Sequence, residues 1–151
     1  MNIFLYFGTY GPILLVLIGM YILKCNILLE GIFVIGFIIN FVINSCLKMM
    51  FKEARPKGNP DTIKGADKDL MNTINQYGFP SGHNQSAGYC IVIIISYTMN
   101  MWLLLFSWFN VFIIAYERYI MKHHSIRQEL YGLFIGGFVG YITTLVMKYY
   151  Q

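Results

Sequence analysis

Long apolar stretches separated by short polar segments dominate the chain. Five apolar stretches are predicted to form membrane helices, and they cover residues 4–23, 28–47, 84–99, 101–120 and 128–148. A spanning helix needs about 20 apolar residues, so the third stretch is short for one. The intervals at 24–27 and 99–101 leave room only for tight turns, so the helices on either side must run antiparallel. We therefore predict an all-α integral membrane protein, a bundle of about five transmembrane helices.

The composition agrees with this prediction and shows where the polar residues gather. Of the 151 residues, 57% are hydrophobic and only 12% are charged, against about 25% charged in soluble domains. We expect a single domain over 1–151. Ten of the 18 charged residues lie between Lys48 and His83, and five more lie between Glu117 and Glu129.

The order of the helices brings these two polar segments to one side of the membrane. Segment 48–83 follows the second helix, and the third and fourth helices then form a hairpin that returns the chain to the same side. Segment 117–129 therefore faces the side that loop 48–83 faces. This predicts an active site at one membrane face, with 48–83 as its polar loop.

The first polar cluster begins at the end of the second helix. Lys48 and Arg55 are seven residues apart, about two helical turns, and Lys52 falls on the same stripe. Asn44 and Asn40 continue the stripe inside the helix, where a polar face should point into the bundle. The alternative is a basic cluster that contacts anionic lipid headgroups.

The second cluster is Pro80-Ser81-Gly82-His83 at the start of the third helix. Ser81 suits an N-cap, and a helix N-terminus offers free N–H groups that bind phosphate. Gly82 has no side chain, so a phosphate can approach the backbone closely there. His83 can donate a proton to a leaving oxygen. The alternative is an ordinary capped helix with a histidine at the membrane surface.

The third cluster begins in the last turn of the fourth helix and continues beyond it. Arg118 can pair with phosphate oxygens, and His124 and Gln128 are neighbours if this region is helical. The Gln128 side-chain oxygen is then expected to accept the Nδ1–H of His124, which leaves Nε2 as a nucleophile. His123 would point about 100° away on a helix and is expected at the membrane surface. The alternative is a solvated or metal-scavenging histidine pair.

Convergence of the three clusters favours a phosphate site over these alternatives. A phosphate needs cationic donors for its oxygens, with a nucleophile and an acid on opposite sides. The last helix also carries Gly132, Gly136 and Gly140 at four-residue spacing, which lets membrane helices approach closely. This spacing is expected to draw the helix into the bundle.

These three clusters resemble the signature of the type-2 phosphatidic acid phosphatase superfamily, over roughly residues 40–140. The resemblance implies that His124 attacks phosphorus to form a phosphohistidine and that His83 protonates the leaving group. It also implies phosphate binding without a metal or other cofactor. The implied phosphate-binding residues are Lys48, Arg55, Ser81, Gly82 and Arg118.

Two positions depart from the usual pattern of that superfamily. Glu117 stands where serine is usual, and Gln128 stands where aspartate is usual, so nucleophile activation differs. The dolichyl diphosphatase branch is similar at Gln128, and the surroundings of His83 and His124 also resemble that branch. The resemblance therefore implies a polyprenyl diphosphate substrate.

The expected protein is a membrane lipid phosphatase, with the bilayer and a lipid phosphate or diphosphate as partners and no nucleic acid. A phosphatidate or other lipid monophosphate phosphatase remains an alternative, as does a catalytically dead lipid-binding relative. Lysine and arginine placement favours a cytosolic site, whereas the dolichyl branch implies the lumenal face of the endoplasmic reticulum membrane. The sequence indicates no oligomeric state.

Overall fold

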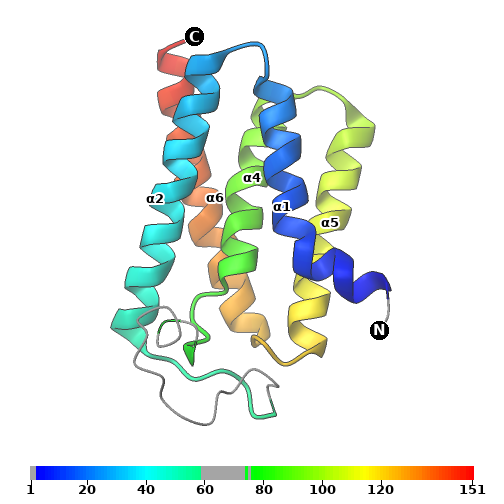
Figure 1. Ribbon diagram of the computed structural model, residues 1–151, viewed down its shortest axis with the longest axis vertical. Helices are drawn as coiled ribbons and strands as arrows, with labels where there is room; N and C mark the ends of the chain where they lie inside the picture. Colours follow the sequence, from blue (N-terminus) through cyan, green and yellow to red (C-terminus); the bar gives the residue numbers. More distant parts are fainter. Residues whose placement is uncertain (1–2, 59–73, 75) are drawn as a thin grey trace.

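Five helices account for most of the computed structural model, which describes residues 3–58, 74 and 76–151. They are α1 (Ile3–Leu23), α2 (Ile27–Phe51), α4 (Gly82–Tyr97), α5 (Met101–Ile120) and α6 (Ile126–Tyr149) (Figure 1). The predicted all-α bundle is confirmed. All of these helices except α4 are long and apolar enough to cross a membrane.

The predicted polar loop 48–83 needs a correction at both ends. Residues 48–51 belong to α2, which ends at Phe51, and α4 already begins at Gly82. Residues 59–73 and 75 of this loop lie outside the described part of the chain.

The two tight turns are built in the same way, by an asparagine that caps the following helix. The Asn26 side chain accepts hydrogen bonds from the Leu28 and Leu29 amides at 3.1 and 3.2 Å. The Asn100 side chain accepts from the Leu103 amide at 3.1 Å. Each cap satisfies amides that have no partner within their own helix, so each turn starts a new helix at once. The predicted antiparallel hairpins follow from this.

α4 is the central helix of the bundle. It packs against all four other helices, and Figure 1 shows it between the α2–α6 pair and the α1–α5 pair. It has only 16 residues, and it begins short of the ends that its neighbours reach on that side. Because the other helices cover it, α4 can carry Asn84 and Gln85 in buried positions.

The α4–α6 contact brings two backbones together. Gly132, Gly136 and Gly140 face the Ser81, Gln85 and Tyr89 backbones in turn. A Cβ atom at Gly132 would lie 2.5 Å from the Ser81 oxygen, and one at Gly140 would lie 2.6 Å from the Tyr89 oxygen. The expected packing role of these glycines is confirmed, and it fixes the start of α4 against the start of α6.

A buried amide network joins α2 to α4. Asn44 Nδ2 donates to Gln85 Oε1 at 2.8 Å and to the Pro80 carbonyl at 3.3 Å. Gln85 Nε2 donates to the Asn40 carbonyl at 2.8 Å and to Asn40 Oδ1 at 3.0 Å. The polar stripe of α2 therefore faces the bundle interior, as predicted. Lys52 does not share it, because α2 has ended and Lys52 is an exposed C-cap with φ of 47°.

Candidate active site

The three predicted clusters meet at one end of the bundle. The C-terminal ends of α2 and α5 and the N-terminal ends of α4 and α6 lie together there (Figure 1). The charges of Arg55, Lys48 and Arg118 all act on the His124 imidazole. Those of Arg118 and Lys48 also act on His83. The predicted convergence of the three clusters is therefore confirmed as a convergence at one end of the bundle.

Contrary to the prediction, Lys48 and Arg55 do not share one helix face. The helix that should have carried both on one face ends at Phe51. Lys48 is a buried residue of α2, whereas Arg55 lies beyond the helix in an irregular segment. Their charges nevertheless interact, and both act on His124.

The first turn of α4 is held in place by its own cap and by α6. The Ser81 side chain accepts from the Asn84 amide at 3.4 Å, as an N-cap does. The Ser81 amide donates to the Gln128 carbonyl at 3.0 Å, which ties α4 to α6. At Gly82 an added Cβ would lie 3.3 Å from Asn44 Oδ1, so the backbone passes close to α2 there. His83 follows at once and is half-buried.

His124 is buried and held through one ring nitrogen. Its Nδ1 lies 2.8 Å from the Gly78 carbonyl oxygen, within hydrogen-bonding distance. A carbonyl oxygen accepts but cannot donate, so Nδ1 carries the proton. In the neutral ring, Nε2 is then left with a lone pair. Sequence reasoning missed Gly78, because any residue supplies a backbone carbonyl and this one lies far from His124 in the chain.

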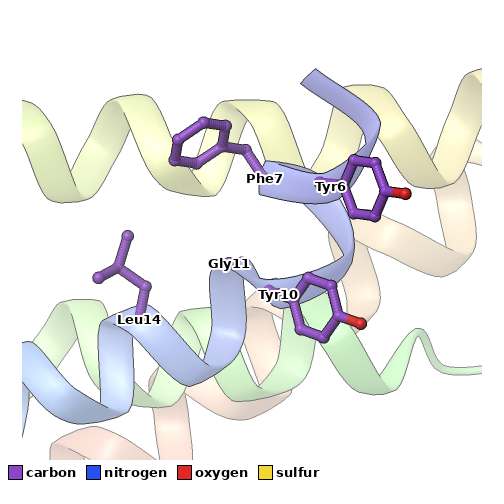
Figure 2. A pocket seen from close by; sticks show the side chains of 5 residues that line it. All are labelled: Tyr6, Phe7, Tyr10, Gly11 and Leu14. Carbon is purple, nitrogen blue, oxygen red and sulfur yellow. The ribbon is translucent and has the colours of Figure 1, made fainter. Parts of the chain in front are cut away.

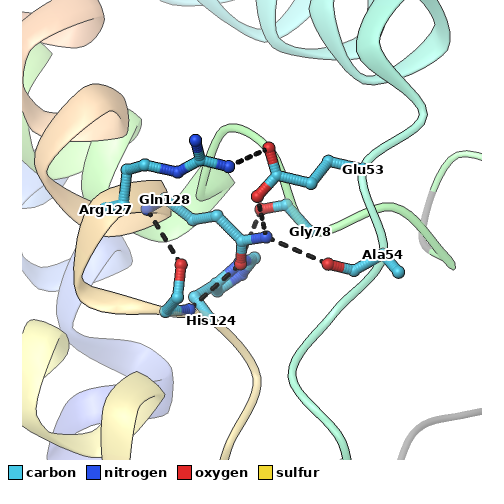
Figure 3. Close-up of polar contacts among 7 residues, drawn as sticks. Glu53, Ala54, Gly78, His124, Arg127 and Gln128 are labelled. Carbon is cyan, nitrogen blue, oxygen red and sulfur yellow. Dashed lines mark hydrogen bonds and ion pairs between the residues drawn. The ribbon is translucent and has the colours of Figure 1, made fainter.

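Gln128 does not make the predicted contact with His124. Its Oε1 accepts from the Ser125 amide at 3.0 Å, in a capping box that starts α6. Its Nε2 donates to Glu53 Oε1 at 2.9 Å and to the Ala54 carbonyl at 3.1 Å (Figure 3). The prediction assumed that both residues lie on one helix. α6 begins at Ile126, so His124 precedes the helix and the two side chains are not neighbours on a helix face.

Gln128 instead supports the segment that holds His124. The Gly78 amide donates to the Glu53 carbonyl at 2.7 Å, so the segments around Glu53 and Gly78 are paired. A Cβ at Gly78 would lie 2.7 Å from the Gln128 amide group. Arg127 adds an ion pair to Glu53 at 2.7 Å (Figure 3). Gln128 therefore binds the Glu53–Ala54 segment and packs against Gly78, and this holds the Gly78 carbonyl in position.

His123 is buried, which corrects its predicted place at the membrane surface. The rule of about 100° per residue fails here, because α5 ends at Ile120 and Lys122 has a left-handed φ of 56°. The amides of His123 and His124 both donate to the Arg118 carbonyl, at 2.9 and 3.3 Å. The His123 charge acts on His83, so this side chain belongs to the site.

Arg118 is buried at the end of α5 and held from two directions. Its Nε donates to the Glu117 carboxylate, and its Nη2 donates to Thr9 Oγ1 at 3.2 Å. Glu117, which stands where the superfamily usually has serine, is itself buried. Its carboxylate accepts the hydrogen bond from the Arg118 guanidinium. Sequence reasoning did not indicate Thr9.

The surroundings of His124 keep its imidazole neutral. Burial first, and then the positive charges of Arg55 and Lys48, lower the pKa of His124 well below its ordinary value of 6.5. The hydrogen bond to Gly78 acts in the opposite direction without reversing this. A neutral ring with a bare Nε2 can act as a nucleophile.

The lowered pKa of His124 predicts a pH dependence of stability. The unfolded chain protonates this ring below pH 6.5 while the folded chain does not, so stability is lost as pH falls. Between pH 6.5 and 5.5 this ring should contribute a loss of about 1 kcal/mol in unfolding free energy. Equilibrium unfolding in detergent of the wild type and His124→Asn measures it. Asparagine does not titrate and keeps a side-chain donor near the Nδ1 position.

Subtracting the His124→Asn curve isolates this ring from the other histidines. The difference between wild type and variant should be constant above pH 6.5 and should grow in the variant's favour below it. Parallel curves down to pH 5.5 would contradict a lowered pKa of His124.

A shallow pocket of about 220 Å³ lies apart from these residues, on α1. Its walls are Tyr6, Phe7, Tyr10, Gly11 and Leu14, all from this one helix (Figure 2). None of these residues belongs to the three clusters, so the pocket is not the candidate active site.

The fold is that of a multi-pass integral membrane protein, and its site collects three cations around two predicted catalytic histidines. The model of the PAP2 superfamily matches residues 28–151, and the chain belongs to that superfamily. Members are phosphatases, so the family indicates membrane lipid phosphatase activity. The match leaves α1 outside. Comparison with curated proteins and with solved structures gives no match.

Proposed function

We propose that this protein hydrolyses the phosphoanhydride of a polyprenyl, dolichyl-type diphosphate and releases inorganic phosphate through a phosphohistidine. The observation that carries the proposal is the orientation of His124. Its Nδ1 donates to the Gly78 carbonyl, which leaves Nε2 unprotonated in a ring on which the charges of three cationic side chains act.

The cations suit the oxygens of a terminal phosphate. Lys48, Arg55 and Arg118 all act on the His124 imidazole, so a phosphate beside Nε2 would lie within their field. Such fixed cations stabilise the charge that grows in a phosphoryl-transfer transition state. The first turn of α4, at Gly82 and His83, adds backbone donors where the helix dipole favours an anion.

The reaction has two steps. His124 Nε2 attacks the terminal phosphorus, so an N–P bond forms as the P–O bond to the bridging oxygen breaks. Burial and then the Arg118 charge lower the pKa of His83 to about 3 in the free protein, so the negative charge of the bound diphosphate must first raise that pKa and let His83 take up a proton. His83 then gives this proton to the bridging oxygen, and the lipid monophosphate leaves. His83 then accepts a proton from water, which attacks phosphorus, breaks the N–P bond and frees inorganic phosphate.

Gln128 and Glu117 have positioning roles in this proposal. Gln128 binds the segment that carries the Gly78 carbonyl, so it supports the nucleophile without touching it. Glu117 accepts from Arg118 Nε and so orients the guanidinium. Neither departure from the usual pattern removes a group that the two steps need, which favours an enzyme over a dead lipid-binding relative.

The diphosphate substrate rests on sequence. Glutamine at 128 and the residues around His83 and His124 resemble the dolichyl diphosphatase branch, for which a site facing the endoplasmic reticulum lumen is expected. A lipid monophosphate would use the same groups, with the lipid alkoxide as the leaving oxygen.

Phosphate release from detergent-purified protein tests the proposal. A polyprenyl diphosphate and phosphatidate would be compared, with a chelator present throughout. We expect metal-independent release from the diphosphate at a kcat/KM at least about tenfold above that for phosphatidate, a difference of about 1.4 kcal/mol in transition-state binding.

Each other outcome rejects a defined part of the proposal. Faster release from phosphatidate would keep the mechanism and reject the diphosphate substrate. Release that the chelator abolishes would reject metal independence. No release from either lipid by folded protein would favour the dead relative.

A further inference from the structure

α1 contributes to the site although the family match does not include it. The match covers residues 28–151, whereas α1 ends at Leu23. Thr9 of α1 nevertheless contacts both a proposed phosphate-binding residue, Arg118, and the proposed acid, His83. Its hydroxyl accepts from Arg118 Nη2 at 3.2 Å, and its backbone is hydrogen-bonded to His83.

Close packing of α1 on α5 makes this reach possible. A Cβ at Gly8 would overlap the Glu117 side chain, and one at Gly11 would lie 2.5 Å from Asn110 Oδ1. The two glycines let the α1 backbone lie directly against the helix that ends in Arg118. Thr9 lies between them in sequence.

A bend in α1 accompanies this packing. Pro12 lies inside the helix and has no N–H for the carbonyl of Gly8, four residues earlier. The N-terminal part of α1 turns away from the axis of the remainder (Figure 1), as proline commonly causes. Thr9 precedes Pro12 by three residues, on the N-terminal side of the proline.

The two partners of Arg118 bind different nitrogens of its guanidinium. Glu117 takes Nε, and Thr9 takes Nη2. Neither of these two contacts uses Nη1, which in the proposed function is left for a ligand oxygen. A hydroxyl orients the guanidinium without cancelling its charge, so the second contact costs the arginine none of its attraction for an anion.

We infer that Thr9 is a positioning residue, whose hydroxyl holds Arg118 in the orientation that binds the transferred phosphate. The inference rests on the proposed function. It assigns a role in phosphate binding to α1, which lies outside the segment that the family model matches.

Three variants on α1 test this inference. Thr9→Val keeps the shape and removes the hydroxyl, and Thr9→Ser keeps the hydroxyl. Tyr10→Phe is the control, because it removes the hydroxyl of the next residue. Tyr10 lines the shallow pocket on α1 (Figure 2). Turnover of the preferred lipid and inhibition by vanadate, a phosphate-shaped anion, are measured for each, with melting temperatures in detergent.

Thr9→Val should lower kcat/KM and weaken vanadate inhibition by about tenfold, since a hydrogen bond to a charged group is lost. Thr9→Ser should recover most of both, and Tyr10→Phe should match the wild type. Thr9→Val should melt within about 2–4 °C of the wild type, since it loses one hydrogen bond worth about 1 kcal/mol. Thr9→Ser and Tyr10→Phe should melt at the wild-type temperature.

The outcomes separate this inference from the function beneath it. A wild-type protein without turnover rejects the proposed function. An active wild type whose Thr9→Val variant keeps full turnover and vanadate affinity rejects only the role of Thr9. Equal losses in Thr9→Val and Thr9→Ser would also reject it, since the hydroxyl would then not be the cause.

Discussion

Replacing His124 with asparagine is expected to lower phosphate release by about 10⁴-fold or more, as loss of a nucleophile does in covalent catalysis. Asparagine offers a side-chain N–H near the position of Nδ1, so the contact with the Gly78 carbonyl has a substitute. It offers nothing in place of Nε2. The loss should therefore appear in kcat, measured by phosphate release from lipid at saturating substrate.

His83→Gln provides the matched comparison, because it removes the proposed acid and leaves the nucleophile. With a nitrophenyl phosphate, whose leaving group needs no proton, the first step should proceed in His83→Gln and fail in His124→Asn. The His83 variant should then accumulate acid-labile phosphoprotein, since water lacks its base. Comparable turnover of lipid by His124→Asn and wild type would overturn the assignment of the nucleophile.

Replacing Gly136 with alanine is expected to destabilise the protein by about 3 kcal/mol or more, the upper range for overpacking. An added Cβ would overlap the Gln85 carbonyl, which is backbone and cannot rotate aside. Helices α4 and α6 would have to separate. For a chain of this size the melting temperature should fall by about 6–12 °C, measured by thermal unfolding in detergent.

Gly137→Ala is the matched control on the same helix. Its added Cβ would lie 3.7 Å from Val92 Cγ2 and 3.9 Å from the Gly88 oxygen, which are ordinary contacts. Its melting temperature should stay within about 2 °C of wild type, as for substitutions without a clash. Similar melting of both variants and wild type would mean that the two helices are not as close as described.

The sequence predicted the features that depend on residue type. Apolar length predicted the helices, and hairpin order predicted which ends meet. The spacing of Asn40 and Asn44 predicted a stripe that faces inward, where both now bond with Gln85.

The contacts of the site were harder to predict, because several depend on the backbone. The partner of His124 is the carbonyl of Gly78, which no residue pattern distinguishes. The burial of His123 depends on where α5 ends and on the left-handed turn at Lys122. Gln128 fits both the predicted spacing and a capping box, and the capping box is what formed.

The short central helix has a consequence for how a lipid meets the site. At 16 residues α4 is about 24 Å long, less than the ~30 Å hydrocarbon thickness of a bilayer, while α2 and α6 exceed that thickness. Figure 1 shows α4 beginning short of its neighbours' ends, so the first turn of α4 is recessed between those ends. If the proposed function holds, a lipid could present its phosphate to this recessed turn while its chain stays in the leaflet, so the proposed reaction would not require extraction of the substrate from the membrane.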